Sequence, residues 1–172
     1  MSAPRQWVIA PPRKALVVGV ADMAASNDSG AEIVTYSLGS CLGITVYDPV
    51  KKIGGMLHLM LPDSKIDAQK AASAPFMFVD TGVPRLFHAV YHLGAERSRL
   101  VLKVAGGAQL LDAQGIFNIG ERNFIALTAI LERNGIGIHS RDVGGVASRT
   151  VRFDLTNGNV SVKSPGAEPY LI

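Results

Sequence analysis

The sequence contains a single cysteine, Cys41, among its 172 residues. One thiol has no partner within the chain, which excludes the disulfide framework of many small secreted proteins. Any role of Cys41 must therefore come from the reduced thiol, either as a small buried hydrophobe or as a nucleophile.

Long apolar runs are also missing. The first two dozen residues include a short apolar stretch, but Pro11, Pro12 and nearby charges interrupt it, so it lacks the continuous apolar segment of a signal peptide. No window approaches the roughly 18 consecutive apolar residues that a transmembrane helix needs. We expect a cytoplasmic protein that is not integral to a membrane.

Charge is sparse and scattered. Charged residues make up 18% of the sequence, and the formal net charge is only +3. A nucleic-acid-binding surface predicts basic clusters interleaved with aromatic residues, and this sequence has only Lys51-Lys52 and a loose group around Arg149 and Arg152. We therefore expect no nucleic-acid partner. The two arginines either face an acidic partner or keep a closing strand soluble.

What the sequence does have is hydrophobic content, at 48%, and eighteen glycines, which together indicate one core with many turns. We predict a single domain at residues 14–164. A loose, proline-containing leader at residues 1–13 precedes it, and a tail at residues 165–172 follows it.

Short segments rich in β-branched residues, separated by turn residues, predict strands along most of the domain. These segments are residues 15–24, 31–37, 41–48, 52–62, 99–107, 136–143, 148–155 and 159–164. The first four lie within about fifty residues, which favours an antiparallel meander or a sandwich.

Two segments have helical periodicity instead. In residues 80–93 the apolar side chains recur at three- and four-residue spacing, Asp80 or Thr81 offers a cap, and Gly94 offers a stop. In residues 118–135 a stripe contains Phe124, Leu127, Ile130 and Leu131, and the segment ends at Asn134-Gly135.

Asn118 and Glu121 have the spacing of a capping box at the start of the second segment. The predicted fold class is α+β, a single layered domain with antiparallel or mixed sheets, sandwich-like, and two main helices packed on one side.

The heptapeptide TYSLGSC, residues 35–41, raises the question of chemistry. If residues 31–37 are extended, Thr35 and Ser37 point to one face because strand side chains alternate. Gly39 permits a sharp turn beside the thiol, and a turn at Gly39-Ser40 can leave backbone N–H groups free for an oxyanion.

A second candidate lies seventeen residues after Cys41. His58 shares a strand face with Met56 and Met60, opposite three leucines, so its access to water is limited and desolvation should lower its pKa. Strand pairing centred on residues 49 and 50 sets Cys41 opposite about His58. A Cys–His pair of this kind generates the thiolate that a nucleophile needs, and Thr35 or Ser37 could orient the imidazole.

On spacing alone, a buried core thiol and a satisfied core histidine are the more common case, and the spacing permits the catalytic pair without requiring it. His88 and His92 share a helix face at i, i+4, as zinc-binding pairs do, but no neighbouring glutamate or cysteine completes a metal site.

The motifs around these residues resemble the CheD family of bacterial chemotaxis proteins. The resemblance begins with T-x-x-LGSC, YDP and GGM-x-H-x-MLP and continues through FVDTGVPRL, LKVAGGAQL, NIGERN, DVGG and RTVRFDLTNGNVSVK. It covers roughly residues 14–164, and its first block is highly specific.

This resemblance implies a protein-glutamine deamidase that acts on the cytoplasmic domains of chemoreceptors, with Cys41 as nucleophile, His58 as base and Thr35 as third residue. It implies acyl transfer through a Cys thioester, with no metal or organic cofactor. Family members often have glycine or leucine where this chain has Tyr36-Ser37, so the approach to the site differs here, and Ser37 stays a candidate for substrate binding.

Three functions remain to be separated. Besides the deamidase, the resemblance implies association with a CheC-type phosphatase, so a non-catalytic adaptor that binds receptors and that phosphatase is an alternative. A peptidase or transglutaminase is the third, because the same acyl-enzyme chemistry serves all of them.

Overall fold

A computed structural model describes residues 14–109 and 118–172. The helical elements of these ranges are η1 (Ser64–Ile66), α1 (Ala68–Ser73), η2 (Pro75–Met77), α2 (Val79–His92), η3 (Arg97–Arg99) and α3 (Ile119–Arg133). No helix in these two ranges is both long enough and apolar enough to cross a membrane.

The described strands form two five-stranded sheets. Sheet A has the order β1 (Ala15–Val18), β3 (Glu32–Leu38), β8 (Arg149–Asp154), β9 (Asn159–Lys163), β10 (Tyr170–Leu171). Sheet B has the order β2 (Asp22–Ser26), β5 (Ile53–Leu59), β4 (Leu42–Asp48), β6 (Val101–Gly106), β7 (Ser140–Val143). Both sheets are mixed, since β1–β3 and β6–β7 pair in parallel.

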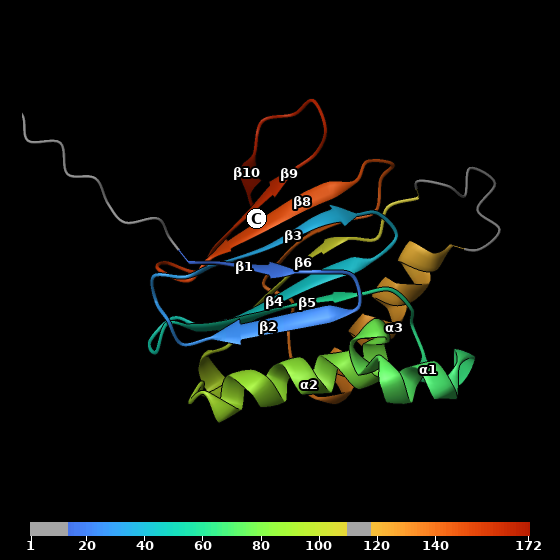
Figure 1. The fold of residues 1–172 in the computed structure, drawn as a ribbon, viewed down its shortest axis with the longest axis horizontal. Coiled ribbons are helices and arrows are strands. Elements are labelled where there is room, and N and C mark those ends of the chain that lie inside the picture. The colour runs from blue at the N-terminus through green and yellow to red at the C-terminus, as the bar shows by residue number, and fades with distance from the viewer. Residues whose placement is uncertain (1–13, 110–117) are drawn as a thin grey trace, which may run out of the picture.

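The sheets and helices make three layers, with α2 and α3 on one side of sheet B and sheet A on the other (Figure 1). The helix-facing side of sheet B packs on α2 and α3 through residues such as Ile44, Leu57 and Leu127. A second core lies between the sheets and includes Ile33, Met56 and Phe153. The predicted single-domain α+β class, with two main helices on one side, is confirmed.

The first predicted strand is wrong in one respect, because residues 15–24 form two strands in different sheets. β1 pairs with β3 in sheet A, whereas β2 pairs with β5 in sheet B. Ala21, at φ 55°, turns the chain between them. Both halves are apolar, so composition could not reveal that the chain changes sheet.

Helix α2 covers almost the predicted range, and Gly94, at φ 104°, follows its C-cap as expected. The predicted cap is wrong: Phe78 is the N-cap and makes no side-chain cap bond. Asp80 instead accepts hydrogen bonds from Ser64, and Thr81 donates to the Pro75 carbonyl. These two side chains fasten the preceding loop to the helix.

Helix α3 also lies where periodicity predicts it, and its apolar stripe packs on the helix-side core. The capping box is not formed, because Asn118 is left-handed at φ 43° and makes no side-chain cap bond. Its Oδ1 accepts instead from Gln109 Nε2 at 2.8 Å.

The predicted leader, residues 1–13, lies outside the described residues. Within the predicted tail, Tyr170 and Leu171 form β10, which extends sheet A by pairing with β9. The turn that joins β8 to β9 has Gly158 at φ 78°.

Candidate functional site

His58 lies on β5 in the layer between the two sheets, and its side chain is fully buried. Met56, two residues earlier, belongs to the inter-sheet core, whereas Leu57 and Leu59 belong to the helix-side core. The predicted face of His58 is confirmed, because alternation along β5 sends even-numbered side chains toward sheet A.

The predicted register of the hairpin is wrong by two residues. His58 pairs with Gly43, and Asp48 pairs with Ile53, so four residues connect β4 to β5. Asp48 Oδ1 accepts from the backbone N–H groups of Val50 and Lys51 and thereby supports this longer turn.

A shift of two residues keeps every side chain on its own face. Cys41, just before β4, is therefore a diagonal neighbour of His58 on the inter-sheet side, where it packs against the inter-sheet core. Diagonal neighbours in a regular ladder lie roughly 7–8 Å apart. The thiol is partly exposed, and it lies at the end of the sheets rather than deep inside them.

The third candidate, Thr35, contacts His58 directly across the sheets. Thr35 Oγ1 lies 2.8 Å from His58 Nδ1 and donates to the Val18 carbonyl at 2.8 Å. Because its single proton goes to that carbonyl, the hydroxyl accepts from Nδ1–H. This arrangement selects the imidazole tautomer whose Nε2 carries the free lone pair.

Ser37 points away from this contact. A bulge separates Thr35 from Leu38 in the pairing of β3 with β8, and Ser37 has φ 57°. The extra residue breaks the alternation, so the expectation that Thr35 and Ser37 share a face is wrong. Thr35 is fully buried, whereas Ser37 is exposed.

Burial sets the protonation of both reactive candidates. Desolvation lowers the pKa of His58 from 6.5 to about 4, and it raises the pKa of the Cys41 thiol from its ordinary value. Both groups are therefore neutral near pH 7. Among buried side-chain atoms of the described residues, only His58 Nε2 and Asn123 Oδ1 have no hydrogen-bond partner.

The turn that carries Cys41 is braced by the segment after β6. Ala108 N–H donates to the Gly39 carbonyl, and Gly107 N–H donates to the Cys41 carbonyl, both at 2.8 Å. Gly106, at φ 112°, passes so close that a Cβ there would collide with the Cys41 carbonyl oxygen. Only glycine permits this approach.

Sequence reasoning missed two buried polar residues beside this turn. Asn123, on α3, is fully buried and donates to the Ser40 carbonyl. Arg149, expected on the surface, is instead buried and forms two hydrogen bonds with Asp142 at 2.8 and 3.0 Å. The signal for Asn123 in the sequence is a polar residue beside the predicted apolar stripe of α3.

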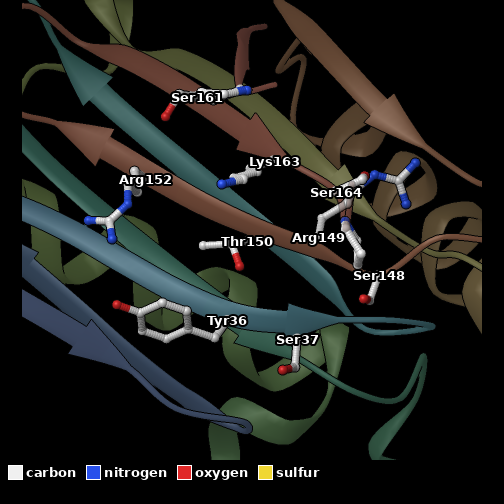
Figure 2. A pocket seen from close by; sticks show the side chains of 11 residues that line it. Tyr36, Ser37, Ser148, Arg149, Thr150, Arg152, Ser161, Lys163 and Ser164 are labelled. Atoms are coloured by element: carbon white, nitrogen blue, oxygen red, sulfur yellow. The ribbon is translucent and has the colours of Figure 1, made fainter. Parts of the chain in front are cut away.

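A groove of about 660 Å³ lies on the outer face of sheet A, over β3, β8 and β9 (Figure 2). Its lining includes Tyr36, Ser37, Thr150, Arg152 and Lys163. Thr35, Cys41 and His58 do not line it, so this groove and the candidate chemical site lie on different sides of sheet A and approach each other at the exposed bulge.

His88 and His92 lie on α2, as expected from their spacing. Within residues 14–109 and 118–172, no group of three or more histidine, cysteine, aspartate or glutamate side chains is arranged to hold a metal ion.

Comparison with known proteins identifies relatives over most of the chain. A family model described as "CheD chemotactic sensory transduction" matches residues 60–164. That match includes Asn123 but begins after Cys41 and His58.

Two relatives match most of this chain and most of their own length. A protein of Syntrophus aciditrophicus named "Probable chemoreceptor glutamine deamidase CheD 1" is 45% identical over 151 residues, which is 88% of this chain and 94% of the relative. A protein of Solibacter usitatus named "Probable chemoreceptor glutamine deamidase CheD" is 45% identical over 157 residues, 91% of this chain and 93% of the relative.

Proposed function

This chain belongs to the CheD family, and we propose that it hydrolyses the side-chain amide of specific glutamines in chemoreceptors to glutamate, with Cys41 as the nucleophile. The single observation that carries the proposal is the 2.8 Å contact of Thr35 Oγ1 with His58 Nδ1, because it leaves Nε2 without a partner among the described residues, on the same side of sheet B as Cys41. A buried imidazole with one nitrogen oriented and the other free has the arrangement of a general base.

In the first step, Cys41 Sγ attacks the carboxamide carbon while its proton moves to His58 Nε2. The resulting imidazolium keeps its Nδ1–H bond to Thr35 Oγ1. Backbone N–H groups of the Gly39-Ser40-Cys41 turn hold the oxygen as it gains negative charge. A neutral thiol and a neutral imidazole in the resting site make this proton transfer part of the attack rather than a step before it.

In the second step, Nε2–H protonates the leaving nitrogen, and ammonia departs from a thioester. The neutral imidazole then takes a proton from water, which attacks the thioester carbonyl. Hydrolysis returns the Cys41 thiol and leaves glutamate on the receptor. The net change is addition of one water and loss of one ammonia, and no cofactor takes part in it.

We further propose that the protein acts in the cytoplasm on receptor cytoplasmic domains, and that a CheC-type phosphatase is a second partner. An adaptor that only bound these partners would have no need of the oriented imidazole or of the glycine that accommodates the Cys41 turn.

The test is incubation of a receptor cytoplasmic fragment with the wild-type protein and with Cys41→Ala, followed by mass spectrometry. We expect a gain of about one dalton at glutamine and release of ammonia with the wild type only. Chain cleavage would identify a peptidase, and crosslinks to amines a transglutaminase. A fragment that binds the protein but shows no change that depends on Cys41 would support the non-catalytic adaptor function.

A further inference from the structure

Asn123 connects three parts of the candidate site. It lies in the second turn of α3, which starts near the end of the sheets (Figure 1). Its side chain is fully buried, and its Nδ2 donates to the Ser40 carbonyl at 3.1 Å and to the Met60 carbonyl at 2.8 Å. Both amide hydrogens are thereby used on backbone of the Cys41 turn and of the residue that follows β5.

The orientation of this amide is fixed by its partners. The Ser40 and Met60 groups are both carbonyl oxygens, which only accept, so the NH₂ end of the amide must face them. The opposite end, Oδ1, is buried and has no partner among the described residues. A buried polar atom without a partner is costly to keep, and the two donated bonds are the structural reason for an asparagine here.

The bond to Ser40 sets the direction of the next N–H group. In a trans peptide, the carbonyl of one residue and the N–H of the next point in opposite directions. Drawing the Ser40 carbonyl toward α3 therefore turns the Cys41 N–H away from it. In the same way, the bond from Ala108 to the Gly39 carbonyl turns the Ser40 N–H outward.

These two N–H groups stay available to a ligand. Within residues 14–109 and 118–172, neither Ser40 N–H nor Cys41 N–H donates to another residue; the Cys41 N–H faces only its own thiol, and both residues are partly exposed. The three carbonyls of Gly39, Ser40 and Cys41 each receive a bond from α3 or from the segment after β6. The turn is therefore fixed through its three carbonyl groups, and its Ser40 and Cys41 N–H groups remain available to a ligand.

The second bond of Asn123 ties this turn to the strand of the base. Met60 lies two residues after His58, and its N–H is held by the Met77 carbonyl at 2.8 Å. One amide therefore fixes the spacing between the Cys41 turn and the end of β5.

We propose that Asn123 is a positioning residue that aims the Cys41 N–H at the oxygen of the bound carboxamide. The inference rests on the proposed deamidase function, because that oxygen is the group that gains charge. The oxygen of the substrate accepts a hydrogen bond from the Cys41 N–H, and the buried side-chain amide of Asn123 fixes the direction of that N–H group.

The test compares Asn123→Leu, which keeps the branching of the side chain at Cγ but removes both donors, with the wild-type protein. We expect kcat for a receptor fragment to fall about 10²-fold with KM within threefold, because a misdirected oxyanion donor costs about that much. Alkylation of Cys41 by iodoacetamide, which forms no oxyanion, should stay within about threefold of the wild-type rate. Damage that merely loosened the site would change both rates together.

Thr128→Val is the matched control on the same helix, because the Thr128 hydroxyl, among the described residues, bonds to the Phe124 and Ile125 carbonyls of α3 itself. We expect wild-type kcat in this variant. Deamidation by Asn123→Leu within threefold of wild type, or a parallel loss of alkylation, would overturn the inference. A wild-type protein that does not deamidate the fragment would instead contradict the proposed function.

If Asn123→Leu does not fold, amide hydrogen exchange in the wild-type protein decides. The Ser40 and Cys41 N–H groups should exchange with protection below about 10-fold, while those of Gly107 and Ala108 should be protected more than about 10³-fold. Protection of the Cys41 N–H as strong as that of Gly107 would mean that it has an internal acceptor, and the inference would be wrong.

Discussion

At the residue scale, the site depends on how one hydroxyl orients one imidazole. Thr35 donates its proton to the Val18 carbonyl and accepts from His58 Nδ1–H, so a residue of sheet A selects the tautomer of a residue of sheet B. The two sheets therefore have to be packed together before the base is correctly arranged.

We predict that Thr35→Val, which keeps the shape but loses the hydroxyl, lowers kcat about 10²-fold, because the imidazole loses its orientation and its imidazolium loses a partner. Thr35→Ser should keep most of the activity. Ser37→Ala, two residues away but on the exposed bulge, should change kcat less than threefold. Equal losses in Thr35→Val and Ser37→Ala would contradict the assigned role of Thr35.

The pH dependence of kcat/KM should report the buried imidazole. Because desolvation lowers the pKa of His58 to about 4, its basic form persists well below the usual 6.5. We predict that kcat/KM for a short receptor peptide begins to fall only near pH 4, in buffers where circular dichroism shows the protein folded. An acid limb near pH 6.5 would mean that the base is solvated or is a different group.

The sequence predicts some residues of the candidate site and not others. Cys41 and His58 stand out by parity and by motif, but the choice between Thr35 and Ser37 depends on a bulge, which alternation alone does not predict. Asn123 is harder still, because its partners are backbone carbonyls about eighty and sixty residues away in the chain.

At the element scale, the β4–β5 hairpin positions the nucleophile turn against the base. Asp48, at the end of β4, is fully buried and binds Arg99 through Nε at 3.0 Å and Nη2 at 2.7 Å. The Arg99 guanidinium holds the pKa of the Asp48 carboxyl far below its usual range, with help from three backbone N–H groups. This ion pair fastens the hairpin turn to the loop after α2.

We predict that Asp48→Ala lowers the free energy of unfolding by about 3 kcal/mol, measured by urea denaturation, because it leaves three backbone N–H groups without their acceptor and removes one of the two carboxylates that pair with Arg99, the other being Glu96. The matched control is Arg152→Ala, which breaks a more exposed pair with Glu32 and should cost less than about 1 kcal/mol. Similar losses in both variants would show that the Asp48–Arg99 pair contributes no more to the free energy of unfolding than an exposed ion pair does.

The register of the β4–β5 hairpin and the limits of β1 and β2 could not be predicted from the sequence. Asp48-Pro49 indicates a turn, but its length follows from the hydrogen bonds that Asp48 accepts, and these add two residues to the loop. The division of residues 15–24 into β1 and β2 depends on which sheet each half joins, a tertiary choice. The helices were easier, since periodicity and a following glycine depend on local sequence.

At the scale of the whole molecule, the close approach of the two sheets brings Thr35 and His58 together. Gly54 on β5 makes this possible, because a Cβ there would lie 2.7 Å from the Phe153 ring and collide with Leu155 of the opposite layer. The layered α+β class could be predicted from strand density and two amphipathic helices. Which strands pair in parallel, β1 with β3 and β6 with β7, could not, because the partner of each strand is decided by tertiary packing rather than by local sequence.

Burial of His58 should also couple the stability of the whole fold to pH. The folded pKa, about 4, lies below the ordinary 6.5, so between these values the unfolded chain binds more protons and stability rises with pH. We predict that the free energy of unfolding falls by about 3 kcal/mol from this group as pH drops from 6.5 to 4. In His58→Leu, the loss over this window should be smaller by that amount, measured by urea denaturation at each pH; equal slopes would contradict a buried neutral imidazole.

The most direct test of the account is detection of an acyl-enzyme on Cys41. A receptor peptide containing a target glutamine is mixed with excess protein, quenched in acid within the first turnover and analysed as intact protein and as peptides. The account predicts an adduct of the peptide minus ammonia, carried by Cys41 and absent from Cys41→Ala. Deamidation that continues in Cys41→Ala, or an adduct on another residue, would contradict it.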